Sequence, residues 1–396
     1  MDLEDSDAGD QSELVDTLDE TTPDVDLGLE RSHPSSEVGS FDLPTAWWPI
    51  AVGAEVSSKP RAVRLGSRRL AIYRDRTGSV RAVDDRCPHR RLPLSMGRLT
   101  PEGDLQCRYH GWCFDGATGK CTAIPNLAPH ERVSPGIKVG VYSVGERIQG
   151  WMRSRPTQDS TLPGEPLDDT VALTHVDAVL SDGFVFVWTG QDPIERSPSE
   201  KVQRDLELGL RTFSGQALVR ASWERLSEAV FWNPGRALNL GVLLGTGPEQ
   251  ADADLSETSD TVSARRHRLS LNLIRVSSFD APIKHVRTVN VTTAVDTGLT
   301  RVAGKAADGS VICQVVVALT PISPARTIVR WRGELNGVAA SLFGGWYSGR
   351  RGLRRLVEHQ GRPLESCVDA LEDTVDSGVE RLRERRRMMG IPAHQK

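Results

Sequence analysis

The stretch that decides the fold is CPHRRLPLSMG at residues 87–97, which CRYHGW follows at residues 107–112. Each stretch holds one cysteine and one histidine, and these four residues are Cys87, His89, Cys107 and His110. Proline and glycine beside them form turns, so each pair is predicted to lie at the tip of a loop. Thiolates and imidazoles bind soft and borderline metals. The two stretches therefore predict a metal centre held between two loops.

Composition bounds the class of protein. With 396 residues, 38% of them hydrophobic and 26% charged, the chain can form two domains with cores. No apolar run approaches the roughly 18 residues of a membrane span, so we expect a soluble protein. The N-terminus lacks an apolar secretory leader, and we therefore expect a reducing cytoplasm. Four further cysteines are expected to pack in the interior, namely Cys113, Cys121, Cys313 and Cys367.

Charge separates the start of the chain from the rest. Residues 1–40 carry 13 Asp and Glu against one Arg, so their net charge is −12 within a total of −4. We expect a disordered acidic tail, because these residues hold too little apolar surface to offset the entropy of ordering. A docking or solubilising role for the tail stays open beside a functionless one.

The body of the chain is expected to form two domains. Short strand-like runs such as RAVRL and RLAIYRD, separated by turn residues, predict a small all-β domain. Longer alternating strands after residue 211 predict an antiparallel sheet, with Val289 and Val291 on one face. The expected boundaries are an all-β domain at 41–146, an insertion at 147–181, a return strand and linker at 182–210, and the last domain at 211–396.

A single amphipathic helix is expected to close the chain at about 366–388. Its apolar residues recur at spacings of three and four, and they are Val368, Leu371, Val375, Val379 and Leu382. This stripe is expected to pack on the sheet. The basic run RLRERRR at its end is interpreted as a solvated helix C-terminus rather than a nucleic-acid site.

The kind of metal centre follows from how the ligands are distributed. Zinc accepts two cysteines and two histidines, but a zinc finger takes both cysteines from one knuckle and both histidines from one helix. Here each loop supplies one of each. A Rieske [2Fe–2S] cluster needs two cysteines on one iron and two histidines on the other, so each loop must reach both irons. The distribution therefore favours the Rieske cluster.

The neighbours of the four ligands carry a family resemblance. They are Pro88, Arg90, Leu94, Ser95, Gly97, Tyr109, Gly111 and Trp112. With them the sequence resembles the Rieske non-heme iron oxygenase α subunits, most closely the vanillate O-demethylase and dicamba monooxygenase type. The resemblance covers nearly everything from residue 41 to 390. It implies an α+β fold, in which an N-terminal all-β Rieske domain precedes a helix-grip domain, an antiparallel sheet with a C-terminal helix.

The resemblance breaks where the family binds its mononuclear iron. Family members use two histidines and a carboxylate, but the matching stretch SWERLSEAVFWNPGRALNLGVLL at 222–244 contains no histidine. Gly235 and Leu240 stand where the histidines are expected, and Trp232 replaces a bridging Asp. Pro and Gly after Asn233 are expected to interrupt the helix. The third ligand position falls near Leu342 or Phe343, where no carboxylate stands.

Other residues offer little replacement for these iron ligands. Glu228 survives near a usual acidic position of the family. His267, His285 and His359 remain, and the first two lie in strand-like runs beside arginines and are interpreted as solvated or core histidines rather than as substitute ligands. The mononuclear iron is therefore expected to be absent.

Three functions remain open on these residues. The first is a subunit that passes electrons to the iron of a homologous partner in a trimer-type assembly, fed by an NAD(P)H-dependent reductase or ferredoxin, and inactive alone. The second is a self-sufficient oxygenase of a small organic substrate with unusual iron ligands. The third is a structural or regulatory subunit.

Overall fold

The computed structural model describes eight segments of the chain, at residues 43–128, 130–142, 144–146, 183–190, 211–244, 254–267, 286–335 and 362–391. The tail expected at 1–40 and the insertion expected at 147–181 lie outside them. Residues Gly39–Lys396 form one compact unit. Among the described residues, no helix is both long and apolar enough to cross a membrane.

Two small antiparallel sheets build the first part of the unit. One has the order β2-β3-β4-β9, with β2 at Arg61–Leu65, β3 at Arg68–Arg74, β4 at Val80–Asp84 and β9 at Val141–Tyr142. The other has the order β5-β6-β7-β8, with β5 at Arg98–Leu99, β6 at Leu105–Gln106, β7 at Cys113–Phe114 and β8 at Cys121–Ala123. Short 3-10 turns lie at Gly53–Glu55 and Leu94–Met96.

The turn between β3 and β4 shows why the chain reverses there. Asp75 Oδ1 accepts hydrogen bonds from the backbone N–H groups of Thr77 and Ser79, and Gly78 adopts a φ of 79°. A short acidic side chain and a glycine at positive φ are what a tight hairpin requires. The prediction of short strands separated by turn residues is confirmed here.

A third sheet brings a distant strand back to the start of the chain. Its order is β1-β11-β10, with β1 at Trp47–Val52, β11 at Phe184–Trp188 and β10 at Val144–Glu146. β11 pairs antiparallel with β1. Both strands are rich in aromatic and β-branched residues, which suits strands that are buried on two faces.

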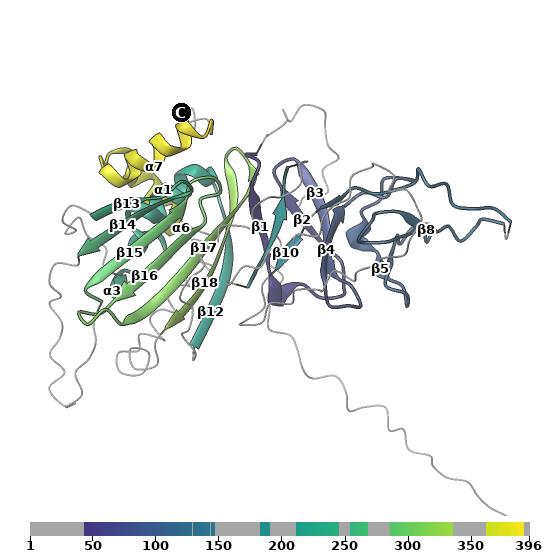
Figure 1. Cartoon of the computed structure of the whole chain (residues 1–396), viewed down its shortest axis with the longest axis horizontal. Helices are drawn as coiled ribbons and strands as arrows, with labels where there is room; N and C mark the ends of the chain where they lie inside the picture. Colours follow the sequence, from purple (N-terminus) through teal and green to yellow (C-terminus); the bar gives the residue numbers. More distant parts are fainter. Residues whose placement is uncertain are drawn as a thin grey trace, which may run out of the picture. The chain divides into compact units, whose positions relative to one another are not determined.

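A seven-stranded antiparallel sheet dominates the second part (Figure 1). Its order is β12-β18-β17-β16-β15-β14-β13, with β12 at Arg211–Val219, β13 at Asp254–Glu257, β14 at Thr261–His267, β15 at Thr288–Ala294, β16 at Thr300–Lys305, β17 at Val311–Ser323 and β18 at Arg326–Leu335. Val289 and Val291 are buried and their neighbours are less so, as the alternation predicts.

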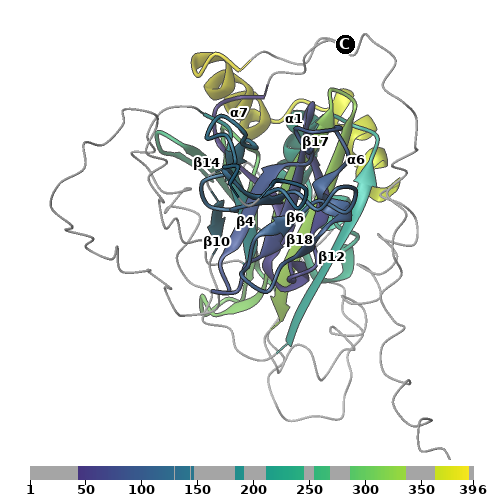
Figure 2. The ribbon, with the colours of Figure 1, turned by 90° about the vertical axis from the view of Figure 1, so that its right-hand side faces the viewer.

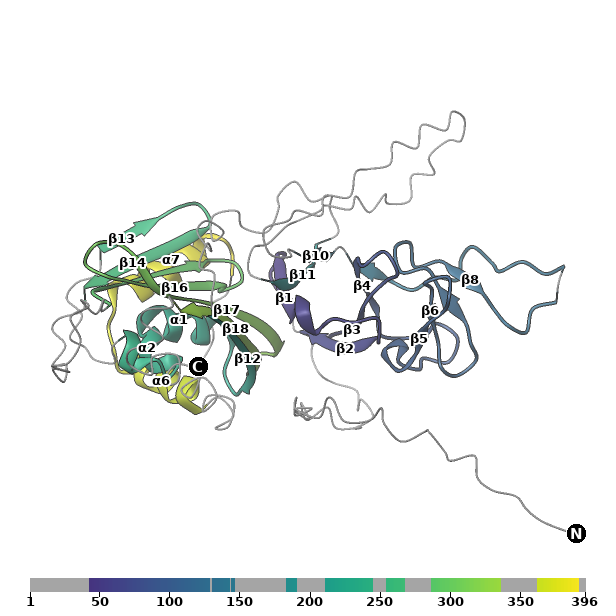
Figure 3. The same cartoon turned by 90° about the horizontal axis from the view of Figure 1, so that it is seen from below.

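Helices cover one face of this sheet (Figure 3). They are α1 at Trp223–Trp232, α2 at Pro234–Ala237, α3 at Gly241–Leu244, α6 at Arg362–Glu372 and α7 at Ser377–Met388. Val315 and Val317 of β17 belong to the same buried cluster as Trp223 and Phe231 of α1. Val316, on the opposite face of β17, packs in a cluster with Phe184 and Phe186 of β11. The α+β architecture expected from the sequence is confirmed.

The end of the chain differs from the expected single helix. α6 and α7 are separate helices, visible in Figure 2, and Val375 in the turn between them is 93% exposed. Asp376 causes the restart, because its side chain accepts hydrogen bonds from the backbone N–H groups of Gly378 and Val379 and so caps α7. The predicted burial of Val375 was wrong, whereas Val379 and Leu382 are buried as predicted.

Candidate functional site: a two-loop metal centre and a closed helix pair

The two loops that carry the candidate ligands share one backbone design. In the first, the Cys87 N–H donates to the Leu92 carbonyl at 2.9 Å, and the Arg91 N–H donates to the Cys87 carbonyl at 2.8 Å. In the second, the Cys107 N–H donates to the carbonyl five residues later at 2.8 Å, and the N–H four residues later donates back at 3.1 Å. The same residue of each loop, Arg91 or Gly111, has positive φ, at 65° and 70°. Each loop is therefore held rigid by its own backbone.

The loop tips meet through their histidines. The ring centroids of His89 and His110 lie 4.5 Å apart, and the Trp112 ring stacks on His89 at 4.6 Å with an interplanar angle of 3°. The Tyr109 ring packs against His110 at 3.8 Å. Sequence reasoning predicted that the two loops come together, and the contact between the histidine rings does bring their tips together.

The cysteines lie deeper than the histidines. Cys87 and Cys107 are 2% and 3% exposed and belong to one buried cluster, which also contains Cys113 and Cys121. Burial, followed by the neighbouring Cys107 sulfur, raises the pKa of the Cys87 thiol to about 11. Because the thiolate is the form that binds metal, a positively charged group between the two sulfurs would favour it. All six cysteines are buried and none forms a disulfide, so the expected packing of the other four in the interior is confirmed.

The donor set fits a [2Fe–2S] cluster. Nδ1 of His89 is buried and has no hydrogen-bond partner among the described residues, which is costly for a polar atom unless a ligand takes its lone pair. No three Cys, His, Asp or Glu side chains in the described segments form a set that could hold one metal ion. A cluster requires less, since each of its irons takes only two protein ligands.

The stretch at 222–244, which the family resemblance matches to iron-binding helices, is broken between α1 and α2. α1 ends at Trp232, Asn233 caps both α1 and α2, and Pro234 begins α2, so the predicted interruption is confirmed. Gly235 and Leu240 are buried, and Trp232 packs at the edge of the large buried cluster. None of these three side chains offers a lone pair suited to a divalent metal.

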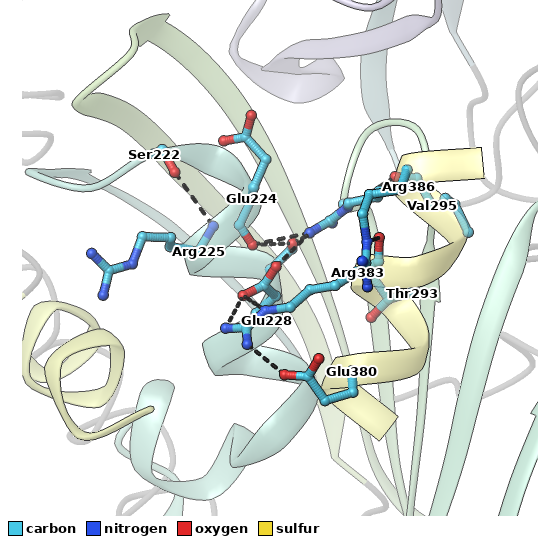
Figure 4. A network of polar contacts seen from close by, with 12 residues as sticks. Ser222, Glu224, Arg225, Glu228, Thr293, Val295, Glu380, Arg383 and Arg386 are labelled. Atoms are coloured by element: carbon cyan, nitrogen blue, oxygen red, sulfur yellow. Dashed lines mark hydrogen bonds and ion pairs between the residues drawn. The ribbon is translucent and has the colours of Figure 1, made fainter. Parts of the chain in front are cut away.

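Glu228 of α1, the acidic residue that survives near the family position, is occupied by cations. Its Oε2 accepts hydrogen bonds from Arg383 at 2.8 and 3.0 Å, and its Oε1 accepts one from Arg386 at 3.3 Å (Figure 4). Glu228 is 5% exposed and Arg386 4%. The Arg386 guanidinium also lies 4.8 Å from the Trp223 ring centroid and donates to Ser227 Oγ and the carbonyls of Glu224 and Val295.

The ion pairs with Glu228 correct the interpretation of the basic run as a solvated helix end. Arg386 follows Leu382 by four residues and Val379 by seven, so it continues the buried stripe of α7. That spacing was the signal in the sequence that could have placed it inside. A long arginine side chain can extend into the interior along an apolar stripe when a buried carboxylate there pairs with its charge.

The remaining candidate histidines give no second metal site among the described residues. His267 ends β14, and its exposed ring lies 3.8 Å from Asp254. His285, His359 and the expected third ligand position near Leu342 and Phe343 lie outside the described segments.

Comparison with known proteins agrees with the first part of the site. Residues 46–143 match the family model of the Rieske [2Fe-2S] domain. The chain thus contains a Rieske-type iron–sulfur domain, and the sequence-based prediction of this domain is confirmed.

Relatives and solved structures extend the comparison. Pheophorbide a oxygenase from Oryza sativa subsp. japonica is 34% identical over 40% of this chain and 32% of its own length. The oxygenase subunit of 3-chlorobenzoate-3,4-dioxygenase from Comamonas testosteroni is 38% identical over 25% and 23%. The chain thus spans about a third of the length of the first of these relatives, and less of the second.

Whole-fold similarity comes from the solved structures. Apo dicamba monooxygenase matches with a TM-score of 0.59 at 20% identity, covering 87% of this chain and 96% of that one. NdmA of Pseudomonas putida CBB5 with caffeine matches at 0.52 and 15%, covering 87% and 89%. These two solved structures share the fold of this chain.

Proposed function

We propose that this chain carries electrons through a [2Fe–2S] cluster to the mononuclear iron of a homologous partner subunit, which oxidises a small organic substrate. The observation that carries the proposal is that Arg383 and Arg386 both bind the carboxylate of Glu228. The expected histidine positions hold Gly235 and Leu240, which are buried and cannot bind metal. A carboxylate in two ion pairs is a poor metal ligand, because binding a metal would leave buried guanidinium charge without a partner.

In this proposal Cys87 and Cys107 hold one iron of the cluster, and His89 and His110 hold the other. The burial of the two sulfurs and the position of the two rings at the loop tips support this division. When bound, the cluster supplies one-electron transfer. The chain's own part is to keep water from the sulfurs and to present the histidines at the surface.

The tip around the histidines has the character of a docking surface. Tyr109 and Met96 are 62% and 52% exposed, although both are large apolar side chains. Four arginines near them are exposed as well, Arg86, Arg90, Arg91 and Arg108, and neither loop contains an acidic residue. Aromatic residues, Met and Arg are enriched in protein interfaces. The tip therefore supports a partner subunit and an NAD(P)H-dependent reductase or ferredoxin, in the cytoplasm, as the proposed partners.

Metal analysis of the purified chain is the first test. The proposal expects about two irons per chain and a Rieske-type electron paramagnetic resonance signal after reduction. Ferrous iron added to the chain should not bind tightly, since the described helices α1 to α3 offer no suitable ligand set. About three irons, with loss of one on replacing a histidine after residue 211, would contradict the proposal.

Co-expression with an iron-competent homologous subunit is the second test. The chain alone, given reductase and dioxygen, should turn over no substrate, whereas the mixed complex should. His110→Ala in this chain should then abolish turnover by the complex. Turnover that survives this change would assign the chain a structural or regulatory role instead.

A self-sufficient oxygenase is the second candidate function. One observation favours it, because the fold matches a dicamba monooxygenase structure that contains non-heme iron and dicamba, at a TM-score of 0.57 and 20% identity. His285 and His359, which lie outside the described residues, would be the first ligands to test. Turnover by the purified chain alone would establish this candidate.

A further inference from the structure

A buried carboxylate lies next to the first cluster loop. Asp85 follows β4, two residues before Cys87, and is 4% exposed. Its Oδ1 accepts a hydrogen bond from the backbone N–H of Ser95 at 2.7 Å, and its Oδ2 accepts one from the Ser95 hydroxyl at 2.8 Å. One side chain thus connects the chain just before the loop to a residue near the end of the loop.

Packing holds the Ser95 end of this contact in place. Leu94 is fully buried in the same cluster as Cys87 and Cys107. On the other side, Gly97 lies so close to the next strand that a Cβ there would be 2.1 Å from the Gln106 carbonyl oxygen. Ser95 can therefore not move away from Asp85 without disturbing the core around the cysteines.

Among the residues that the structure describes, the carboxylate of Asp85 has no cationic partner. None of the ion pairs formed by the described residues includes Asp85. Asp75 on the neighbouring hairpin differs, because Arg81 lies 2.7 Å from its carboxylate. A buried charge that only dipoles compensate acts on its surroundings over a longer distance than a paired one.

We propose that Asp85 is a positioning residue for the cluster, which fixes the first loop through Ser95 and keeps the reduction potential of the cluster low through its charge. Reduction adds an electron, so a negative charge nearby disfavours the reduced form. Hydrogen bonds and charges around the ligands are known to set the potential of such centres. The inference rests on the cluster assignment in the proposed function.

Two variants of the full-length protein separate charge from hydrogen bonding. Asp85→Asn keeps the shape and both contacts, since the amide oxygen can accept from the Ser95 N–H and the amide nitrogen can donate to the hydroxyl. Ser95→Ala keeps the charge and removes one donor that compensates it. The two changes are therefore expected to shift the potential in opposite directions.

The measurement is a redox titration of the cluster, followed by its visible absorbance. Asp85→Asn should raise the potential by on the order of a tenfold change in the reduction equilibrium, about 59 mV for one electron. Ser95→Ala should lower it, and the control Glu102→Gln, which removes an exposed carboxylate whose charge the solvent screens, should leave it unchanged. An unchanged potential in Asp85→Asn, or an equal rise in the control, would overturn the inference.

If Asp85→Asn loses the cluster, the reduction potential of Ser95→Ala is the deciding measurement. A fall in that potential supports the inference, and any other result overturns it. Failure of the proposed function is distinguishable. If the wild-type protein shows no Rieske signal, the cluster assignment fails. If the signal is normal but the potential does not respond to Asp85→Asn, only the role of Asp85 fails.

Discussion

His110 illustrates how much depends on single side chains at the loop tips. Its ring contacts both His89 and Tyr109. His110→Ala should abolish the Rieske-type paramagnetic signal, because an iron that loses one of two protein ligands also becomes open to water. The matched control is His130→Ala, an exposed histidine that is no candidate ligand, which should keep the signal. A retained signal in His110→Ala would contradict the ligand assignment.

Arg386 is the residue on which the α1 to α7 contact depends. Arg386→Ala removes one of the two guanidinium partners of Glu228 and empties the space over Trp223. Removing one partner of a buried ion pair costs about 3–5 kcal/mol, and Arg383 retains part of the compensation, so we expect a loss near the lower end. Urea unfolding measures it. Arg387→Ala, one position along on the exposed side, should change stability by less than about 0.5 kcal/mol.

Among the elements, the junction between α6 and α7 is the most specific. Asp376 caps α7, and its carboxylate also pairs with Arg266 of β14 at 3.0 and 3.2 Å, where Arg266 is 5% exposed. Asp376→Ala should therefore lower the free energy of unfolding by about 3–5 kcal/mol, because it leaves the buried Arg266 guanidinium without a partner and removes the helix cap. Thermal or urea unfolding would show it. An equal loss in Asp373→Ala, which is exposed in the same turn, would refute this explanation.

The same junction marks the limit of prediction from sequence. Periodicity identified the strands of the large sheet and the apolar stripe of the last helices, because both follow directly from which face is buried. Periodicity wrongly included Val375 in the buried stripe, because spacing alone does not reveal that Asp376 pairs with Arg266 of another element. Local motifs predicted the turns of the two loops for the opposite reason, as the backbone hydrogen bonds that close each turn join residues within the same motif. Asp85 escaped notice because nothing in its sequence pattern indicates burial.

At the scale of the whole molecule, the candidate cluster lies entirely within the unit Gly39–Lys396. Removal of residues 1–40 should therefore leave the absorbance and paramagnetic signal of the cluster unchanged, because the residues that match the Rieske domain, 46–143, and all four candidate ligands follow the removed segment. Comparing iron content and unfolding midpoints of the two proteins tests this. Loss of folding in the shortened protein would show that the acidic segment contributes to the core.

Residues 91 and 111 have the same backbone conformation in the two loops, yet they are expected to tolerate substitution to different degrees. Position 91 already holds a side chain at positive φ, at a cost of roughly 1–2 kcal/mol against glycine, and its arginine is exposed. Position 111 has the same backbone, but a Cβ there would also lie 2.9 Å from the Pro125 ring. Substitutions should thus be tolerated at position 91, where glycine should increase stability. At position 111 any residue other than glycine should lower stability. Saturation mutagenesis of both codons, sorted for folded protein, would reveal the asymmetry.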